Sequence, residues 1–226
     1  MIARRLAVAA WRVFPTDQAG SAIATLLAAQ QQEGMLPADP SVVESVAFSR
    51  SGRVLATTDG DGTVRLWDPV TGRAIGAPLQ AATHASVYGV AFSPDGKWLA
   101  TGDSVGVVRV WNALTRQPAG PPMRAAGAQA KVYAVAFSPD GRWLATADGD
   151  GTVQVWNPLT SQPAGPPLRA ASAQVGVRQL VYSSDGKWLA TADGNGTVRV
   201  WNPLTRKPIG GPLPTGAQAG VLRNTE

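Results

Sequence analysis

Short apolar runs alternate with polar turns through most of the chain, and their spacing predicts β-strands. In one representative segment, residues 87–92 are mostly β-branched or aromatic, and residues 98–101 form a second short apolar run. Between them, residues 94–96 read Pro-Asp-Gly, which is typical of a tight turn. One segment further on, an Asp-Gly turn at 148–151 precedes an apolar run at 153–156. Each segment is therefore expected to fold as a meander of antiparallel strands.

An outer fourth strand is expected to complete each meander. In the third segment the candidate is 164–168. Pro166 and Pro167 donate no ladder hydrogen bond, so this strand can lie only at the edge of its sheet.

The meander is an internal repeat, because tryptophan recurs every 44 or 45 residues with similar neighbours. The four copies read VAFSRSGRVLATTDGDGTVRLWD, VAFSPDGKWLATGDSVGVVRVWN, VAFSPDGRWLATADGDGTVQVWN and LVYSSDGKWLATADGNGTVRVWN. The recurring tryptophans near their ends are Trp67, Trp111, Trp156 and Trp201. Such a repeat cannot bury both of its faces alone, so the copies are expected to stack side by side.

These units resemble the blades of the WD-repeat β-propeller family, in which the third strand ends in Trp-Asp. The first copy carries Trp67-Asp68 and the other three carry Trp-Asn, and the match covers about residues 41–215. The resemblance implies an all-β fold, a β-propeller with four four-stranded antiparallel blades in a domain spanning 39–216. The expected blades are, approximately, 41–82, 86–127, 131–172 and 175–216.

The family's blades also contain a hydrogen-bonded set that joins a histidine, a hydroxyl, a turn aspartate and the tryptophan. The resemblance implies the hydroxyl at Thr57, Thr101, Thr146 and Thr191, and the turn position at Asp61, Val105, Asp150 and Asn195. No copy has the usual Gly-His pair; His84 is either a displaced remnant of it or a loop residue. Packing is therefore expected to stabilise these blades more than the polar set does.

Residues 1–38 differ from the repeats, being rich in alanine with apolar residues at helical spacing. Pro15 ends a first predicted helix, and Gly34 ends a second one, so a short α-helical hairpin is expected before the blades. The segment resembles the helical linker that precedes propellers in large bacterial signalling ATPases and kinases with WD repeats; alternatively, it caps an exposed blade edge. Residues 217–226 are expected to be a flexible tail.

Composition narrows the functional classes. The chain has no cysteine, no apolar run near the roughly 18 residues of a membrane span, and an apolar run after Arg4 and Arg5 that is too short for a signal peptide. A cytoplasmic location without membrane contact is therefore expected. The net charge is +5, but Lys and Arg never form a run longer than two, which makes nucleic acid an unlikely partner.

Catalysis and metal binding find little support in the residue inventory. One histidine and no cysteine leave no nucleophile, base and acid set, so neither an enzyme nor a cofactor is expected. The DGDG stretches at 59–62 and 148–151 resemble calcium loops, but a strand follows each of them at once, as in a hairpin turn.

The predicted function is a protein-protein interaction scaffold. In the resembling family, partners often dock on the face that bears the loops entering the first strand, where the residue just inside that strand projects. This implies Glu44, Tyr88, Tyr133 and Arg178, which differ while their neighbours repeat; alternatively, they are tolerant surface positions. The alternative function is a detached or truncated sensor or regulatory propeller of a larger bacterial signalling ATPase or kinase.

Four blades are at the lower end of the range for propellers, about 4 to 8, and an open array leaves two end faces exposed. Three arrangements follow: a homodimer that closes an eight-bladed ring, a monomer whose helices shield one end, or a fragment of a longer propeller. The partner is expected to be a protein of unknown identity.

Overall fold

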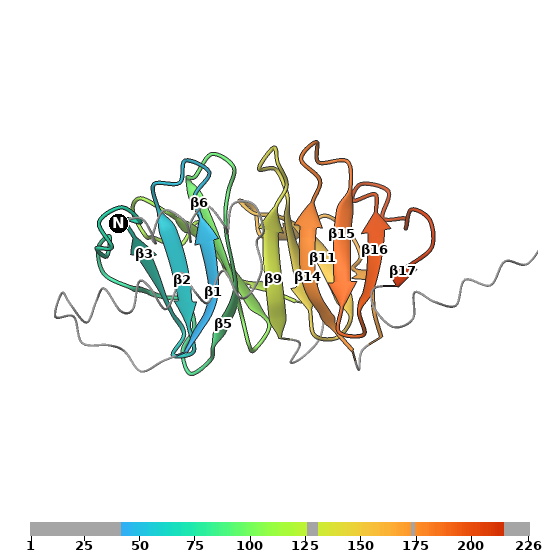
Figure 1. The fold of residues 1–226 in the computed structure, drawn as a ribbon, viewed down its shortest axis with the longest axis horizontal. Coiled ribbons are helices and arrows are strands. Elements are labelled where there is room, and N and C mark those ends of the chain that lie inside the picture. Colours follow the sequence, from blue (N-terminus) through green and yellow to red (C-terminus); the bar gives the residue numbers. More distant parts are fainter. Residues whose placement is uncertain (1–41, 126–130, 173–174, 215–226) are drawn as a thin grey trace, which may run out of the picture.

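A computed structural model describes residues 42–125, 131–172 and 175–214, and these residues form four antiparallel sheets arranged in a row (Figure 1). The all-β class and the four antiparallel sheets predicted from the repeat are thus confirmed. The predicted helical hairpin at 1–38 and the tail at 217–226 lie outside the described residues.

Each sheet is one blade, numbered in chain order. Blade 1 contains β1 (Val43–Phe48), β2 (Leu55–Asp59), β3 (Thr63–Trp67) and β4 (Leu79–Gln80). Blade 2 contains β5 (Val87–Phe92), β6 (Trp98–Asp103), β7 (Val107–Asn112) and β8 (Met123–Arg124). Blade 3 contains β9 (Val132–Phe137), β10 (Leu144–Asp148), β11 (Thr152–Asn157), β12 (Gln162–Pro163) and β13 (Leu168–Arg169). Blade 4 contains β14 (Val177–Tyr182), β15 (Leu189–Asp193), β16 (Thr197–Trp201) and β17 (Leu213–Pro214).

A serine and an aspartate close the hairpin between the first two strands of blades 2, 3 and 4. In blade 2, Ser93 Oγ accepts a hydrogen bond from the Trp98 amide at 2.9 Å and donates one to Asp95 at 2.6 Å. The bond from Ser93 lowers the pKa of Asp95. Gly96 completes the turn with a φ of 71°, which favours glycine.

The outer strand of blade 3 corrects the predicted strand at 164–168. Two short pieces replace it: β12 pairs with the end of β11, and β13 pairs with the start of β11. Pro166 and Pro167 lie between the two pieces, and without amide hydrogens they cannot continue the ladder across the gap.

The core lies between blades and consists of one kind of interface used three times. In each case the leucine and tryptophan face of one blade packs against the alanine and valine face of the blade before it. Leu99 and Trp111 of blade 2 belong to the same buried cluster as Ala56 and Val64 of blade 1. The equivalent clusters join blades 2 and 3 through Leu144, Trp156, Ala100 and Val108, and blades 3 and 4 through Leu189, Trp201, Ala145 and Val153.

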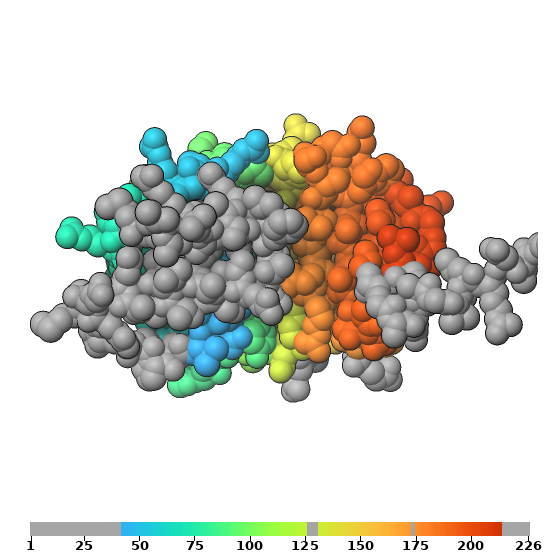
Figure 2. Space-filling model, viewed as in Figure 1, coloured from blue at the N-terminus to red at the C-terminus, as the bar shows by residue number. Residues whose placement is uncertain are grey.

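The row does not close on itself. Adjacent inner strands pack together in the pairs β1–β5, β5–β9 and β9–β14, whereas the described strands of blades 1 and 4 share no comparable contact. Blade 4 lies at the right-hand end of the row in the space-filling view (Figure 2). Its alanine and valine face is therefore open: Val181 is 61% exposed, and Ala190, Val198 and Val200 are half-buried, although their counterparts in other blades are covered.

Two polar pairs recur inside the blades. The tryptophan Nε1 donates to a threonine Oγ1 in every blade: Trp67 to Thr57 (2.9 Å), Trp111 to Thr101 (3.1 Å), Trp156 to Thr146 (3.3 Å) and Trp201 to Thr191 (3.0 Å). At the end of the second strand, a buried aspartate pairs with an arginine in three blades: Asp59 with Arg65, Asp103 with Arg109, and Asp193 with Arg199. Two of these arginines also donate to a carbonyl of the preceding blade, Arg109 to Ala81 at 2.6 Å and Arg199 to Ala170 at 2.5 Å.

Blade 3 lacks this ion pair. Gln154 takes the place of the arginine and donates instead to carbonyls of its own blade, Val155 at 3.0 Å and Gly165 at 2.7 Å. Asp148 is fully buried, and its Oδ1 has no hydrogen-bond partner among the described residues. Burial, with a smaller contribution from the charge of Asp150, raises the pKa of Asp148 to about 8.

This raised pKa predicts a stability that falls with rising pH. The folded state holds the Asp148 proton up to about pH 8, whereas the unfolded state releases it near its ordinary value of 3.8. Unfolding therefore becomes easier as the pH rises between these two values. The variant Asp148→Asn should lose this slope and be more stable than the wild type at pH 8, on the order of 2 kcal/mol.

Urea denaturation at pH 5 and pH 8, followed by tryptophan fluorescence, measures both effects. As a control of opposite sign, Asp193→Asn should lower stability at pH 8 because it deprives half-buried Arg199 of its carboxylate. An Asp148→Asn variant with the wild-type pH slope would show that Asp148 is ionised in the folded protein.

A second prediction concerns Tyr182, which stands where blades 1 to 3 have phenylalanine. Its ring is buried and its hydroxyl has no hydrogen-bond partner among the described residues. Removing an unsatisfied buried hydroxyl should stabilise the protein, so Tyr182→Phe is expected to gain about 1 kcal/mol in urea denaturation. A loss of stability would mean that the hydroxyl has a partner, such as a bound water.

Candidate functional site

The four predicted partner-binding residues occupy one special position in their strands. In the first strand of every blade the ladder with the second strand skips one residue; in blade 1, Val43 pairs with Asp59 but Ser45 pairs with Thr58. The same β-bulge occurs in blades 2, 3 and 4. The skipped residues are Glu44, Tyr88, Tyr133 and Arg178. A bulge frees a side chain from the alternation of the sheet and redirects it, and bulges are frequent next to functional sites.

The middle of this set forms a stack. The rings of Tyr88 and Tyr133 have centroids 5.9 Å apart and planes inclined by 23°. The guanidinium of Arg178 lies 4.2 Å from the centroid of Tyr133, and the ammonium of Lys131 lies 5.9 Å from that of Tyr88. Both arrangements are cation–π contacts. We call these five residues, Glu44, Tyr88, Lys131, Tyr133 and Arg178, the bulge ladder.

Glycines lie beside three of the ladder side chains, in the turns of the same blades. A methyl group at Gly149 would come within 3.2 Å of the Tyr133 ring, and one at Gly194 within 3.5 Å of Arg178 Nε. The corresponding residue in blade 1 is Gly60, where a methyl group would be 3.9 Å from the carboxylate of Glu44. Only the Tyr133 ring comes so close that a side chain on the neighbouring glycine would crowd it, so Gly149 lets this ring lie against the turn.

Two further glycines bring blade 2 close to blade 3, where the two rings stack. A methyl group at Gly89 would lie only 3.2 Å from Ala134 Cα, and one at Gly102 would overlap with the side chain of Val132. The close approach of β5 and β9 that these glycines permit places Tyr88 within stacking distance of Tyr133.

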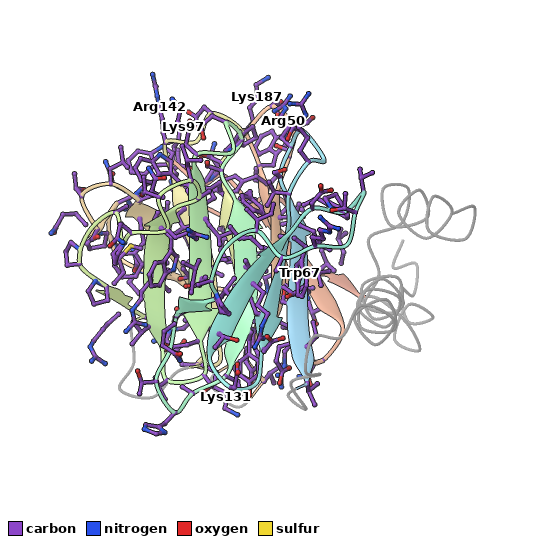
Figure 3. All side chains as sticks on the ribbon, turned by 90° about the vertical axis from the view of Figure 1, so that its left-hand side faces the viewer. Arg50, Trp67, Lys97, Lys131, Arg142 and Lys187 are labelled. Atoms are coloured by element: carbon purple, nitrogen blue, oxygen red, sulfur yellow. The ribbon has the colours of Figure 1, made fainter. Side chains whose placement is uncertain are left out.

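Charge is distributed differently at the two ends of the blades. The hairpins between first and second strands carry Arg50, Lys97, Arg142 and Lys187 at one end, and Lys131 of the ladder lies at the opposite end (Figure 3). Three of the hairpin cations have an aspartate at 3.4 to 3.8 Å: Lys97, Arg142 and Lys187. No carboxylate of the described residues forms an ion pair with Lys131 or Arg178 of the ladder, which leaves these two charges available to a ligand.

The turn residues implied by the family resemblance have a local role. Asp61 Oδ1 accepts hydrogen bonds from the amide and hydroxyl of Thr63, and Asp150 does the same for Thr152. The backbone amide of Asn195 donates a hydrogen bond to Asp193 Oδ1 at 3.0 Å. The buried carboxylates of the blades lie two residues before these turn positions, at Asp59, Asp103, Asp148 and Asp193. This role was not predicted from the sequence, although an aspartate stands there in all four copies. His84 is exposed in the loop between β4 and β5, with a φ of 57°.

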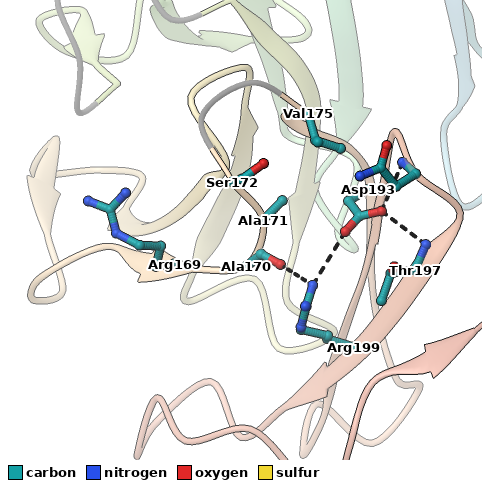
Figure 4. A pocket seen from close by; sticks show the side chains of 9 residues that line it. Arg169, Ala170, Ala171, Ser172, Val175, Asp193, Thr197 and Arg199 are labelled. Carbon is teal, nitrogen blue, oxygen red and sulfur yellow. Dashed lines mark hydrogen bonds and ion pairs between the residues drawn. The ribbon is translucent and has the colours of Figure 1, made fainter.

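A cavity of about 310 Å³ lies at the junction of blades 3 and 4 (Figure 4). Arg199, Asp193 and Ala170 line it, and they are bonded to one another as described above; Arg169 points away from this group. Since its central polar groups satisfy one another, the cavity is part of the blade junction and is a weaker candidate than the ladder.

Nothing in the described part of the chain gathers three metal-ligating side chains of the His, Cys, Asp or Glu type at one place. Over the same residues there is no helix with the length and apolar character to cross a membrane.

Comparison with known proteins gives two results. A family model described as WD domain, G-beta repeat, matches residues 31–68, 77–112, 123–157 and 166–202, which is more than half of the chain. The second, third and fourth matches each run from an outer strand to the end of the third strand of the next blade. The chain is also similar to the protein named NAD(+) hydrolase ApTIR from Actinoplanes sp., with 37% identity over 78 residues. That alignment covers 34% of this chain and 10% of the relative, so the chain spans a small part of the relative's length. Four matches in phase with the four observed sheets establish that the chain belongs to the WD-repeat family.

Proposed function

We propose that this chain is a non-catalytic protein-interaction scaffold and that its partner docks on the bulge ladder. WD-repeat domains generally mediate protein interactions, which supports the class of function. The observation that carries the choice of surface is the stack itself: Tyr133 contacts both the ring of Tyr88 and the guanidinium of Arg178.

Physical reasons favour this surface over the rest of the molecule. Tyrosine and arginine are enriched among the residues that dominate binding energy at interfaces. The two tyrosine rings stack on each other, and Tyr133 also lies against Gly149, so the tyrosines would lose less side-chain entropy when a partner binds. Three residue types occupy the four bulged positions, with glutamate in blade 1, tyrosine in blades 2 and 3 and arginine in blade 4, as expected where the blades contact different parts of a partner.

The proposal requires neither a cofactor nor a catalytic residue. The NAD(+) hydrolase relative is named for an activity, but the similar segment is a tenth of that protein. An alternative proposal is a sensor or regulatory propeller of a larger bacterial signalling protein, and similarity to part of a much longer relative favours it. A neighbouring reading frame for an ATPase, a kinase or another signalling enzyme would support this alternative.

We also propose a homodimer that closes an eight-bladed ring. The open face of blade 4 is an alanine and valine face, and in blades 1 to 3 such a face covers the leucine and tryptophan face of the next blade. The leucine and tryptophan face of blade 1, which contains Leu55 and Trp67, has no preceding blade in the chain to cover it. Leu55 and Trp67 are already buried in the single chain, so ring closure would replace their present contacts with contacts to the partner chain.

The scaffold proposal predicts that the double variant Tyr88→Ala, Tyr133→Ala loses partners retained by the wild type. Affinity purification with quantitative mass spectrometry, followed by binding measurements with the purified partner, should show a loss of about tenfold or more. The matched control is Arg142→Ala, which removes an 81% exposed cation at the opposite end of the blades. Equal capture by the wild type and the double variant would contradict the proposed surface.

The dimer proposal predicts a mass in solution of twice the 23.4 kDa of the chain in light scattering. Val181→Glu places a charge on the open face of blade 4 and should give the monomer without loss of folding, since Val181 is 61% exposed. A wild-type monomer over a wide range of concentration would exclude the ring.

A further inference from the structure

The two cations of the bulge ladder differ from the cations that form ion pairs within the blades. Buried aspartates form ion pairs with Arg65, Arg109 and Arg199. Three hairpin cations form ion pairs with the aspartate of their own turn. Arg178 and Lys131 are exposed, and each is positioned over a tyrosine ring. They are thus ordered by an uncharged partner.

Stacking leaves a guanidinium ready to bind a carboxylate. The guanidinium carbon of Arg178 lies over the Tyr133 ring, 4.2 Å from its centroid, and this contact uses the positive charge of the group without pairing its N–H donors with a carboxylate. Those donors match the two oxygens of a carboxylate, and a planar fork held in place loses little freedom when the bonds form.

The rest of the ladder gives the site a direction. Glu44 lies at the blade 1 end and is exposed, whereas Asp61 in the turn of the same blade lies 3.9 Å from Arg65 and accepts hydrogen bonds from Thr63. At the other end, the charge of Asp193 is neutralised by Arg199. Asp150 is half-buried and accepts hydrogen bonds from Thr152. The raised pKa of Asp148 keeps that carboxyl group protonated at neutral pH. An acidic group is therefore attracted to blades 3 and 4 and repelled by blade 1.

We propose that the bulge ladder binds an extended acidic peptide segment. A carboxylate of the segment pairs with Arg178, Lys131 adds a second favourable charge, and a neighbouring side chain lies on the exposed edges of Tyr88 and Tyr133. This inference rests on the proposed function, and it adds the chemistry of the partner.

The same features disfavour single-stranded nucleic acid, which also binds to aromatic rings and cations. A phosphate backbone needs cations along its whole path, whereas the ladder carries the exposed carboxylate of Glu44 in blade 1. The exposed hairpin cations lie at the opposite end of the blades and cannot extend the ladder (Figure 3).

The test is a selection of random heptapeptides displayed on phage against the full chain. Asp and Glu should be enriched among the selected peptides, and the best of them, made synthetically, should bind the Arg178→Gln variant about tenfold more weakly in fluorescence anisotropy. Arg178→Lys should fall between the two, since it keeps the charge and loses the planar fork. The control Arg169→Gln removes an exposed arginine of β13 and should bind within about twofold of the wild type.

Each other outcome has a defined meaning. Selected peptides that depend on Tyr133 but show no acidic enrichment would overturn the inference and leave the proposed function standing. A selection without any Tyr133-dependent peptide would overturn both. An oligouridylate of about ten nucleotides that binds more tightly than the best peptide, and that is weakened by Arg178→Gln, would assign the ladder to nucleic acid instead. Thermal melting of each variant separates a loss of binding from a loss of folding.

Discussion

Packing between successive blades is the interaction on which the rest of this structure depends. In blades 2, 3 and 4 the leucine and tryptophan face is buried against the alanine and valine face of the preceding blade. Burying one tryptophan contributes roughly 4 to 6 kcal/mol by area, against about 1 kcal/mol for its hydrogen bond to threonine. The polar pairs inside the blades therefore orient the tryptophans, and the apolar contact supplies most of the stability. The same rule explains why the last blade is the one with an open apolar face.

Stacked blades bring equivalent positions of different repeats into a line, and the bulge ladder is the result. A single bulged residue would be an isolated side chain on the surface. Four of them, on inner strands that pack in order, make a continuous surface with an acidic end, an aromatic middle and a basic end. Because these side chains project out of the sheets, their identity can change without disturbing the buried interfaces. The fold and the proposed binding surface are thus carried by different positions of the same repeat.

The junction of blades 2 and 3 combines two departures from the repeat. Gly89 and Gly102 allow the closest approach of the backbones there, and Gln154 replaces the arginine that elsewhere spans from one blade to the preceding one. The stacked tyrosines lie above this junction. A close backbone contact and an aromatic stack join these two blades. The charged link is missing at this junction because Gln154 replaces the arginine, so Asp148 is buried without a cation.

The sequence by itself determined the repeat, the all-β class, the position of most strands and the four residues that vary between blades, because these follow from local propensity and from periodicity along the chain. Only the tertiary structure decided that Glu44, Tyr88, Tyr133 and Arg178 are bulged, that two of them stack, and that Lys131 joins them. A bulge is a mismatch between two strands and a stack is a contact between two blades, so neither can be predicted from the sequence of one segment. The split outer strand and the Asp–Arg pairs were also missed, although the prolines and the repeated aspartates were visible. Their consequences depend on which atoms the neighbouring strand and blade bring within reach, and that is a property of packing.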